Sequence, residues 1–199
     1  VFDGTDPAPR HEEDATVPLG VYGRSKLAGE LALRASGAKH LILRTAWVYA
    51  ARGQNFLRTM LRRGAERDEL RIVDDQIGSP TPARWIADGT AHVLQRLHSM
   101  DKQERELALG TYHLTASQRC SWHEFAASIF DAAQQHGLLQ KVPRLCAIPS
   151  AEFPVRATRP AFSVLDNAKL ALVFGLQLRP WKEGMREVIG EIADARFNV

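Results

Sequence analysis

Hydrophobic and polar residues follow two kinds of pattern along the chain. In several stretches apolar side chains recur every three or four positions, the spacing of one face of a helix. Helices are predicted in this way at residues 21–35, 54–67, 82–98, 121–135, 166–174 and 180–193. Short apolar runs predict strands at residues 40–49, 70–73, 111–114 and 144–148, and residues 1–2 would end another strand. Together these elements predict an α/β fold.

Residues with capping chemistry mark where some of these helices begin. Ser121, followed three positions later by Glu124, has the pattern of a capping box. Thr81 before Pro82 fits an N-cap and a first helical residue. Residues 101–106 are strongly charged, and we expect an exposed loop there.

Composition and charge exclude several classes of protein. The chain has 199 residues, of which 45% are hydrophobic and 25% charged, as in ordinary globular proteins. A net charge of +3 is too mild to indicate nucleic-acid binding, and no apolar run approaches the roughly 20 residues of a membrane helix. Cys120 and Cys146 form neither a metal-binding spacing nor a disulfide framework, which favours reduced thiols in the cytoplasm.

The motif Tyr22-x-x-x-Lys26 at the start of the first predicted helix suggests chemistry. Residues four apart share one helix face, so the phenol and the ammonium lie side by side. A nearby positive charge lowers the pKa of tyrosine from about 10, which lets the phenol exchange a proton with an oxygen near neutral pH. This suits the interconversion of a carbonyl and an alcohol while a nicotinamide carries the hydride. Because the motif is short, a surface tyrosine above a lysine is the alternative interpretation.

Further motifs around this pair match a known family in order and over nearly the whole chain. They are Val1-Phe-Asp-Gly4, Tyr22-Gly-Arg-Ser-Lys26, Leu43-Arg-Thr-Ala-Trp47-Val-Tyr49, Asn55-Phe56, Asp75-Gln-Ile-Gly-Ser-Pro-Thr81, and Arg159-Pro160 followed by Ser163. On these motifs the chain resembles the extended short-chain dehydrogenase/reductase family, and within it the dTDP-4-dehydrorhamnose reductases.

The resemblance implies an activity and gives roles to particular residues. The intact enzyme would reduce the 4-keto group of dTDP-4-dehydro-L-rhamnose to dTDP-L-rhamnose with NADPH or NADH. Tyr22 would give its proton to the developing alkoxide, while Lys26 would lower the pKa of Tyr22 and bind the nicotinamide ribose. Trp47 would pack against the sugar or nucleotide of the substrate. Arg159 would bind the diphosphate through its planar fork, or else be a surface ion-pair residue.

A glycine-rich turn that would hold a dinucleotide pyrophosphate is missing from the sequence. We therefore expect the C-terminal part of a longer enzyme, in which the catalytic threonine precedes Val1 and which binds no cofactor by itself. Residues 1–50 would be the end of a Rossmann-like dinucleotide-binding domain with its parallel sheet and the catalytic helix. Residues 51–199 would mainly form a smaller, mixed α/β substrate-binding lobe, with helices returning to the sheet.

Metal binding and partners follow from the same resemblance. Some family members use a magnesium-bridged dimer with glutamate ligands, and one of these positions aligns with Arg84 here while another falls near Glu191. Because Mg²⁺ needs oxygen ligands, a cation at Arg84 argues against that metal. The catalytic helix pairs with its own copy in much of the wider family, which leaves a homodimer open.

Two other functions stay open. One is a different sugar-nucleotide epimerase or dehydratase of the same superfamily. The other is a non-catalytic regulatory subunit on this fold, like the methionine adenosyltransferase beta subunit. The presence of both Tyr22 and Lys26 argues against the regulatory subunit.

Overall fold

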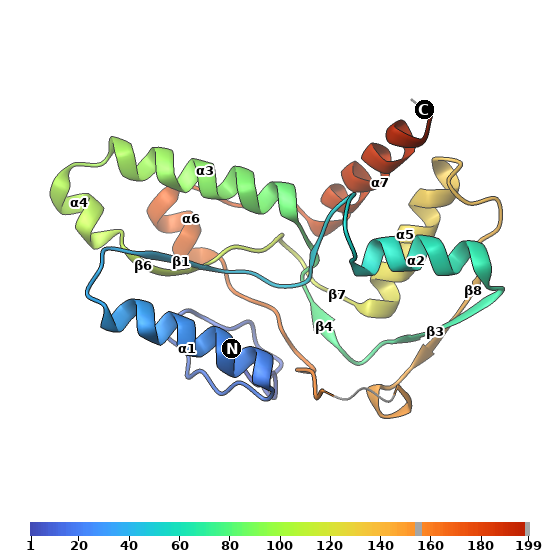
Figure 1. The fold of residues 1–199 in the computed structure, drawn as a ribbon, viewed down its shortest axis with the longest axis horizontal. Helices are drawn as coiled ribbons and strands as arrows, with labels where there is room; N and C mark the ends of the chain where they lie inside the picture. The colour runs from blue at the N-terminus through green and yellow to red at the C-terminus, as the bar shows by residue number, and fades with distance from the viewer. Residues whose placement is uncertain (154–156, 198–199) are drawn as a thin grey trace.

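The computed structural model describes residues 1–153 and 157–197, which form an elongated molecule with helices above and below short parallel strand pairs (Figure 1). The helices are α1 (Val21–Ala35), α2 (Phe56–Glu66), α3 (Ala83–Ser99), α4 (Lys102–Leu107), α5 (Trp122–Gln135), α6 (Ala168–Phe174), α7 (Trp181–Phe197) and the 3₁₀ turn η1 (Ser150–Glu152). The strands are β1 (Leu41–Arg44), β2 (Val48–Tyr49), β3 (Glu69–Val73), β4 (Ile77–Gly78), β5 (Thr81–Pro82), β6 (Gly110–His113), β7 (Cys120–Ser121) and β8 (Arg144–Ile148). The predicted α/β class is confirmed.

One half of the molecule is built on the parallel pair of β1 and β6. Leu41 faces Gly110 and Arg44 faces His113 in the register of this pair. Helices α3 and α6 lie on one side of the pair and α1 on the other (Figure 1). Tyr112 on β6, Leu170 on α6 and other fully buried apolar side chains form the core between strands and helices.

The other half is built on the parallel pair of β3 and β8, against which α5 packs with α2 and α7. Its core is larger and rich in aromatic residues, including Phe125, Phe130 and Trp181, all at most 2% exposed. Two short pairs connect the halves: β2 with β5 is parallel, and β4 with β7 is antiparallel.

Several predicted boundaries are confirmed because their causes are local. The first helix spans the predicted residues 21–35 and is followed by Gly37 in the left-handed region, with φ of 69°. Ser121 and Glu124 form the predicted capping box of α5, with both side chain-to-backbone bonds present. The strand predicted at residues 144–148 is β8.

The prediction of an exposed loop at residues 101–106 is wrong. The segment contains α4, which begins with a second capping box between Asp101 and Glu104. Arg105 adds support because its guanidinium donates to the carbonyls of Leu97 and Met100 near the end of α3. Capping and this tie to α3 stabilise a short helix that a charge count alone does not reveal.

The strand predicted at residues 40–49 is in fact two strands, β1 and β2. Trp47 lies between them with φ of 48°, in the left-handed region, which interrupts an extended backbone. The prediction for Thr81 is also wrong: Thr81 lies in β5 and Pro82 is the N-cap of α3. The Thr81 hydroxyl donates to the Ser79 carbonyl and accepts from the Ala116 amide, so it is committed elsewhere.

The predicted strand end at Val1 and Phe2 does not form, because no described segment pairs with it in a ladder. Phe2 is nonetheless buried, with its ring edge-on to His113 at 5.7 Å and beneath the guanidinium of Arg44. Packing rather than strand pairing fixes the start of the chain.

Helix α1 differs from the other long helices because none of its residues is buried. Val21, Tyr22 and Leu31 are 74%, 76% and 52% exposed. The apolar side chains of α1 therefore add nothing to the cores of the described chain, and a partner surface on α1 stays a prediction. No helix in the described ranges is both long and apolar enough to cross a membrane.

Two helical glycines offer a test of the packing between α2 and α5. A Cβ on Gly64 in α2 would lie 2.4 Å from Cε1 of the fully buried Phe130, whereas a Cβ on Gly29 in α1 would meet nothing within 4 Å. We expect Gly64→Ala to lower the free energy of unfolding by about 1–3 kcal/mol through overpacking. Gly29→Ala is the matched control and should raise it by about 0.5–1 kcal/mol through helix propensity. Urea denaturation measures both, and equal effects of the two variants would contradict this packing.

Candidate active site

Helix α1 carries Tyr22 and Lys26 to the edge of a cavity of about 420 Å³. The Lys26 Nζ lies 5.4 Å from the centroid of the Tyr22 ring, which is the side-by-side arrangement predicted from their spacing. Thr45, at the end of β1, and Ser163 line the same cavity. The Tyr22 ring is largely open to solvent on its outer side, so the phenol is accessible to a molecule bound there.

A buried ion pair lies at the base of this cavity and ties α1 to β1. Arg44 binds Glu30 through two parallel bonds, Nε to Oε1 at 2.9 Å and Nη2 to Oε2 at 2.7 Å. The two side chains are 6% and 11% exposed. Burial raises the pKa of Glu30, but the hydrogen bonds and charge of Arg44 outweigh it and hold that pKa below its usual range. The ion pair keeps the helix that carries Tyr22 close to the strand ends.

Trp47, which the family resemblance predicts to contact the substrate, lies three residues beyond the end of β1. Its indole stacks on that of Trp122, with ring centroids 3.5 Å apart and planes within 4°. The ring also packs on Gly78, where a Cβ would approach the indole Cε2 to 2.3 Å. Within the described chain the Trp47 N–H has no protein acceptor, which leaves a donor for a bound molecule.

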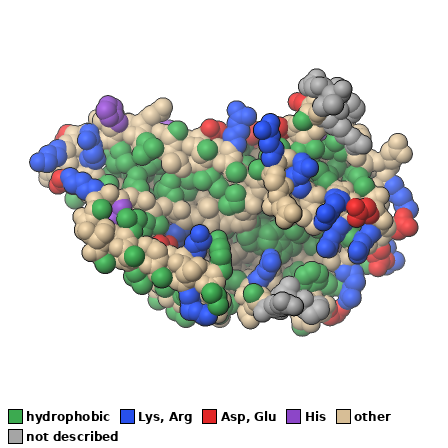
Figure 2. Space-filling view, in the orientation of Figure 1, with side chains coloured by type: hydrophobic (Ala, Val, Ile, Leu, Met, Phe, Trp, Pro, Cys, Tyr) green, Lys and Arg blue, Asp and Glu red, His purple; other side chains and the backbone are tan. Residues whose placement is uncertain are grey.

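Arg159 lines a second pocket, of about 220 Å³, between α2, β3 and η1. Its walls are mainly apolar and aromatic, with Trp122 and Phe56 among them, and three guanidinium groups surround it: Arg63, Arg71 and Arg159. Arg71 pairs with Glu152, whereas Arg63 and Arg159 make no ion pair within residues 1–153 and 157–197. Figure 2 shows Lys and Arg side chains gathered over α2 on this face.

The segment 159–163 lies between the two pockets. Arg159 lines the second pocket, while Pro160, Phe162 and Ser163 line the cavity of Tyr22 and Lys26. Its backbone is fixed to β4, because Ile77 donates to the Ala161 carbonyl and Ser163 donates to the Ile77 carbonyl, each at 2.8 Å. The Tyr22 cavity and the pocket of Arg159 are therefore neighbours on one face.

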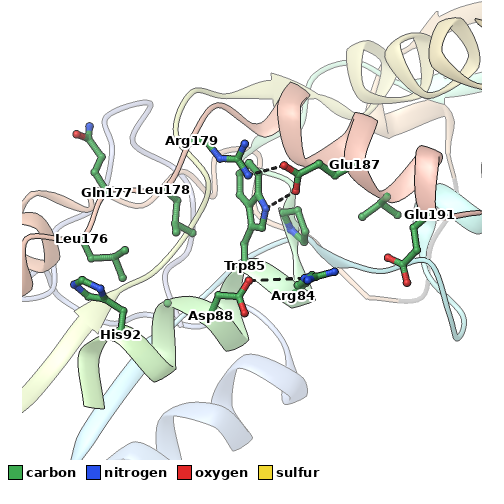
Figure 3. A pocket seen from close by; sticks show the side chains of 13 residues that line it. Arg84, Trp85, Asp88, His92, Leu176, Gln177, Leu178, Arg179, Glu187 and Glu191 are labelled. Atoms are coloured by element: carbon green, nitrogen blue, oxygen red, sulfur yellow. Dashed lines mark hydrogen bonds and ion pairs between the residues drawn. The ribbon is translucent and has the colours of Figure 1, made fainter. Parts of the chain in front are cut away.

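A larger cavity, of about 640 Å³, lies elsewhere, between α3 and α7 (Figure 3). Glu187 there accepts from Trp85 Nε1 at 2.8 Å and pairs with Arg179. Arg84 and Glu191, the positions compared with magnesium ligands, both line this cavity, and Arg84 lies 3.9 Å from Asp88. Within the described residues no group of three His, Cys, Asp or Glu side chains could hold a metal ion. The absence of magnesium stays a prediction.

Sequence reasoning did not find Trp122, Gln76 or the Arg44–Glu30 pair. Trp122 follows the capping residue Ser121, which predicts its position in a helix but not its contact with Trp47. The sequence predicts Glu30 as an exposed residue of a helix and Arg44 as a residue of a strand. Nothing in their spacing predicts that they meet. Only the tertiary arrangement of α1 against β1 reveals the pair.

Comparisons with known proteins show the family to which the sequence is similar. The model of the RmlD substrate binding domain matches residues 1–193. The chain is 43% identical over 192 residues to a dTDP-4-dehydrorhamnose reductase of Salmonella typhimurium, covering 96% of this chain and 62% of that protein. It is 47% identical to the protein of that name from Burkholderia thailandensis, covering 92% and 61%. The chain therefore spans about three fifths of the length of these relatives.

Solved structures show the same likeness in three dimensions. A dTDP-4-dehydrorhamnose reductase from Clostridium acetobutylicum has a TM-score of 0.84 at 37% identity, covering 96% of this chain and 62% of that one. One from Bacillus anthracis, in complex with NADP, has a TM-score of 0.82 at 35% identity, with the same two coverages. A UDP-galactose 4-epimerase, at 18% identity and a TM-score of 0.72, shares the fold alone.

The ion pair of Glu30 and Arg44 offers a test of how α1 is held. Glu30→Ala leaves the guanidinium of Arg44 buried without its partner, and we expect a loss of about 3 kcal/mol in the free energy of unfolding. The matched control is Glu106→Ala, which removes an exposed pair with Lys39 and should cost at most about 1 kcal/mol.

The pH dependence of the same ion pair has a definite sign. Because the pKa of Glu30 is lowered in the folded state, its contribution is fully present above the ordinary glutamate pKa of about 4.3 and is lost as pH falls through the lowered value. Urea titrations of wild type and Glu30→Ala should converge in acid. A gap that stays constant down to low pH would contradict this origin.

Proposed function

The chain belongs to the RmlD substrate binding domain family, and on this basis we propose that it forms the substrate-binding part of an NADPH-dependent dTDP-4-dehydrorhamnose reductase. The intact enzyme reduces the 4-keto group of dTDP-4-dehydro-L-rhamnose to dTDP-L-rhamnose. The observation that carries the proposal is the side-by-side placement of Tyr22 and Lys26 at one cavity. Relatives that are 43–47% identical bear the name of this reductase, which supports the substrate.

The proton chemistry falls to Tyr22. NADPH, or NADH as the alternative, would supply the hydride for C4 of the sugar when bound to the intact enzyme. Tyr22 donates its phenolic proton to the C4 oxygen, so that the carbonyl becomes an alcohol without a free alkoxide. The Lys26 ammonium beside the ring stabilises the phenolate that remains. The open outer side of Tyr22 and Lys26 fits this cofactor, because a nicotinamide and its ribose need access to both groups.

The remaining residues hold the substrate. Trp47 presents one indole edge and a free N–H beyond the end of β1, which suits packing against a sugar nucleotide. Arg159 and Arg63 provide cations without ion-pair partners in the described chain, beside an aromatic wall, and a guanidinium binds a diphosphate through two parallel bonds. We assign the diphosphate contact to Arg159. A cytoplasmic location and a homodimer are part of the same proposal.

The alternatives have less support. Solved structures of sugar-nucleotide epimerases that share the fold are only 15–18% identical to this chain, which argues for a shared fold and no more. A regulatory subunit needs neither Tyr22 nor Lys26, yet both lie together at an open cavity. Oxidation of NADPH measured with several dTDP-sugars in the intact protein tests all three functions.

Tyr22→Phe in the intact enzyme removes the only proton donor assigned to the reaction. We expect turnover to fall about 10²–10⁴-fold, because this is the usual contribution of general acid catalysis. NADPH affinity should stay nearly unchanged. Tyr49→Phe is the matched control: the Tyr49 hydroxyl is buried with no partner in the described chain, so turnover should stay within a few-fold of wild type. A Tyr22→Phe enzyme that is as active as the Tyr49→Phe enzyme would contradict the role of Tyr22 as the proton donor.

Trp47→Ala removes the indole proposed to contact the substrate. We expect the affinity for dTDP-L-rhamnose to fall by about 1–3 kcal/mol, which is the typical loss for one well-packed aromatic contact. NADPH affinity should change much less. Calorimetry measures both, and an unchanged affinity for the sugar nucleotide rejects the role of Trp47.

A further inference from the structure

The nearly buried side-chain amide of Gln76 connects Trp122 to Ser150, and both of these residues line the pocket of Arg159. Gln76 is 9% exposed and lies between β3 and β4, in the loop that follows Val73. Its Oε1 accepts from Trp122 Nε1 at 3.3 Å, and its Nε2 donates to Ser150 Oγ at 2.8 Å. An indole N–H is only a donor, so the orientation of the amide is fixed: the oxygen has to face Trp122.

Ser150, on one side of the Gln76 amide, is held in place by Asp75. Ser150 donates its backbone N–H to both carboxylate oxygens of Asp75 at 2.9 Å and its hydroxyl to Oδ1 at 2.5 Å. The hydroxyl proton of Ser150 is thus used, and its lone pair is free to accept from Gln76. Burial raises the pKa of Asp75, but these bonds outweigh it and hold that pKa below the usual range, as expected for a carboxylate that stays charged.

On the other side of the Gln76 amide lies the stacked pair of indoles, Trp122 and Trp47. Trp122 lies against Trp47 on one side and tilts against Phe56 at 4.5 Å on another. Stacking fixes the distance between two rings but permits them to slide and rotate in their plane, because dispersion contacts have little direction. A hydrogen bond at the edge of Trp122 supplies the missing direction. The plane of Trp122 in turn sets the plane of Trp47.

We propose that Gln76 is a positioning residue. It fixes the in-plane orientation of the Trp122 ring, so that Trp47, which stacks on that ring, meets the sugar nucleotide in one fixed orientation. The inference rests on the proposed function for the role of Trp47, but the relative orientation of the Trp47 and Trp122 rings is a property of this chain alone. Gln76, Trp122 and Ser150 line the same pocket as Arg159, so the network also determines part of the wall of that pocket. Gln76 acts through Trp122 and Trp47 and takes no part in the reaction.

The first measurement needs no ligand. Two indoles stacked at 3.5 Å couple their electronic transitions and give a paired positive and negative band in far-ultraviolet circular dichroism. Gln76→Leu removes both hydrogen bonds at similar size, and we expect it to lose most of the amplitude of this couplet. Gln134→Leu, at an exposed position of α5, is the matched control and should retain the couplet. Trp85→Phe, which removes an indole outside the stack, should retain it as well.

The second measurement is calorimetric titration with dTDP-L-rhamnose. Gln76→Leu loses the hydrogen bond that directs Trp122, and we expect its affinity for dTDP-L-rhamnose to fall about five- to tenfold. Gln134→Leu should keep the wild-type affinity. Trp122→Phe removes the same N–H together with the stacked indole and should weaken binding at least as much. The double variant should be no weaker than Trp122→Phe alone, because both lack the same bond.

The outcomes separate the two proposals. A wild-type couplet and wild-type affinity in Gln76→Leu overturn the positioning role, and so do additive losses in the double variant. An intact wild-type protein that does not bind dTDP-L-rhamnose overturns the proposed function, while the couplet still decides whether Gln76 sets the relative orientation of the two indoles. If Gln76→Leu does not fold, Ser150→Ala removes the anchor and leaves the amide. It should then reduce both the couplet and the affinity in the same direction, and wild-type values would overturn the proposal.

Discussion

The bidentate pair of Arg44 and Glu30 holds α1 against the end of β1, and the position of Tyr22 and Lys26 relative to the strand ends depends on it. Helix α1 buries none of its residues, so hydrophobic packing contributes little to its position. Polar contacts take its place: the ion pair at Glu30, and a bond of 2.8 Å from Arg34 to the Thr111 hydroxyl on β6. Such contacts are directional, and they fix the rotation of the helix about its axis as well as its distance from the strand.

The segment 159–163 connects the cavity proposed for proton transfer to the pocket proposed for substrate binding. The segment 159–163 forms part of both pockets, and its bonds to β4 make it a rigid partition between them. On the proposed function, a sugar nucleotide that spans the partition would place its charged part near Arg159 and its sugar toward Tyr22. Binding energy gained at the remote diphosphate would then orient the reacting carbon, which is how enzymes use non-reacting parts of a substrate.

Features with local causes could be predicted from the sequence. Tyr22 and Lys26 share a face because helical periodicity requires it, and Ser121 with Glu124 announces the start of α5. The same capping pattern at Asp101 and Glu104 was present, but the density of charge around it favoured a loop. The break at Trp47 could not be predicted, because a large aromatic residue rarely adopts a positive φ and only the packing around it selects that conformation. The stack on Trp122 depends on how distant segments meet, which no local pattern encodes.

The backbone at Trp47 has a consequence for anyone who wishes to engineer this protein. A φ of 48° at a residue with a bulky side chain costs on the order of 1–3 kcal/mol, and glycine or asparagine at that position relieves the cost. This relief offsets part of what is lost when the stacked ring is removed. A library selected only for heat resistance will therefore select less strongly against glycine or asparagine at position 47 than the loss of a stacked ring suggests. Given the substrate contact proposed for Trp47, screens on this chain should select for ligand retention as well as for thermal tolerance.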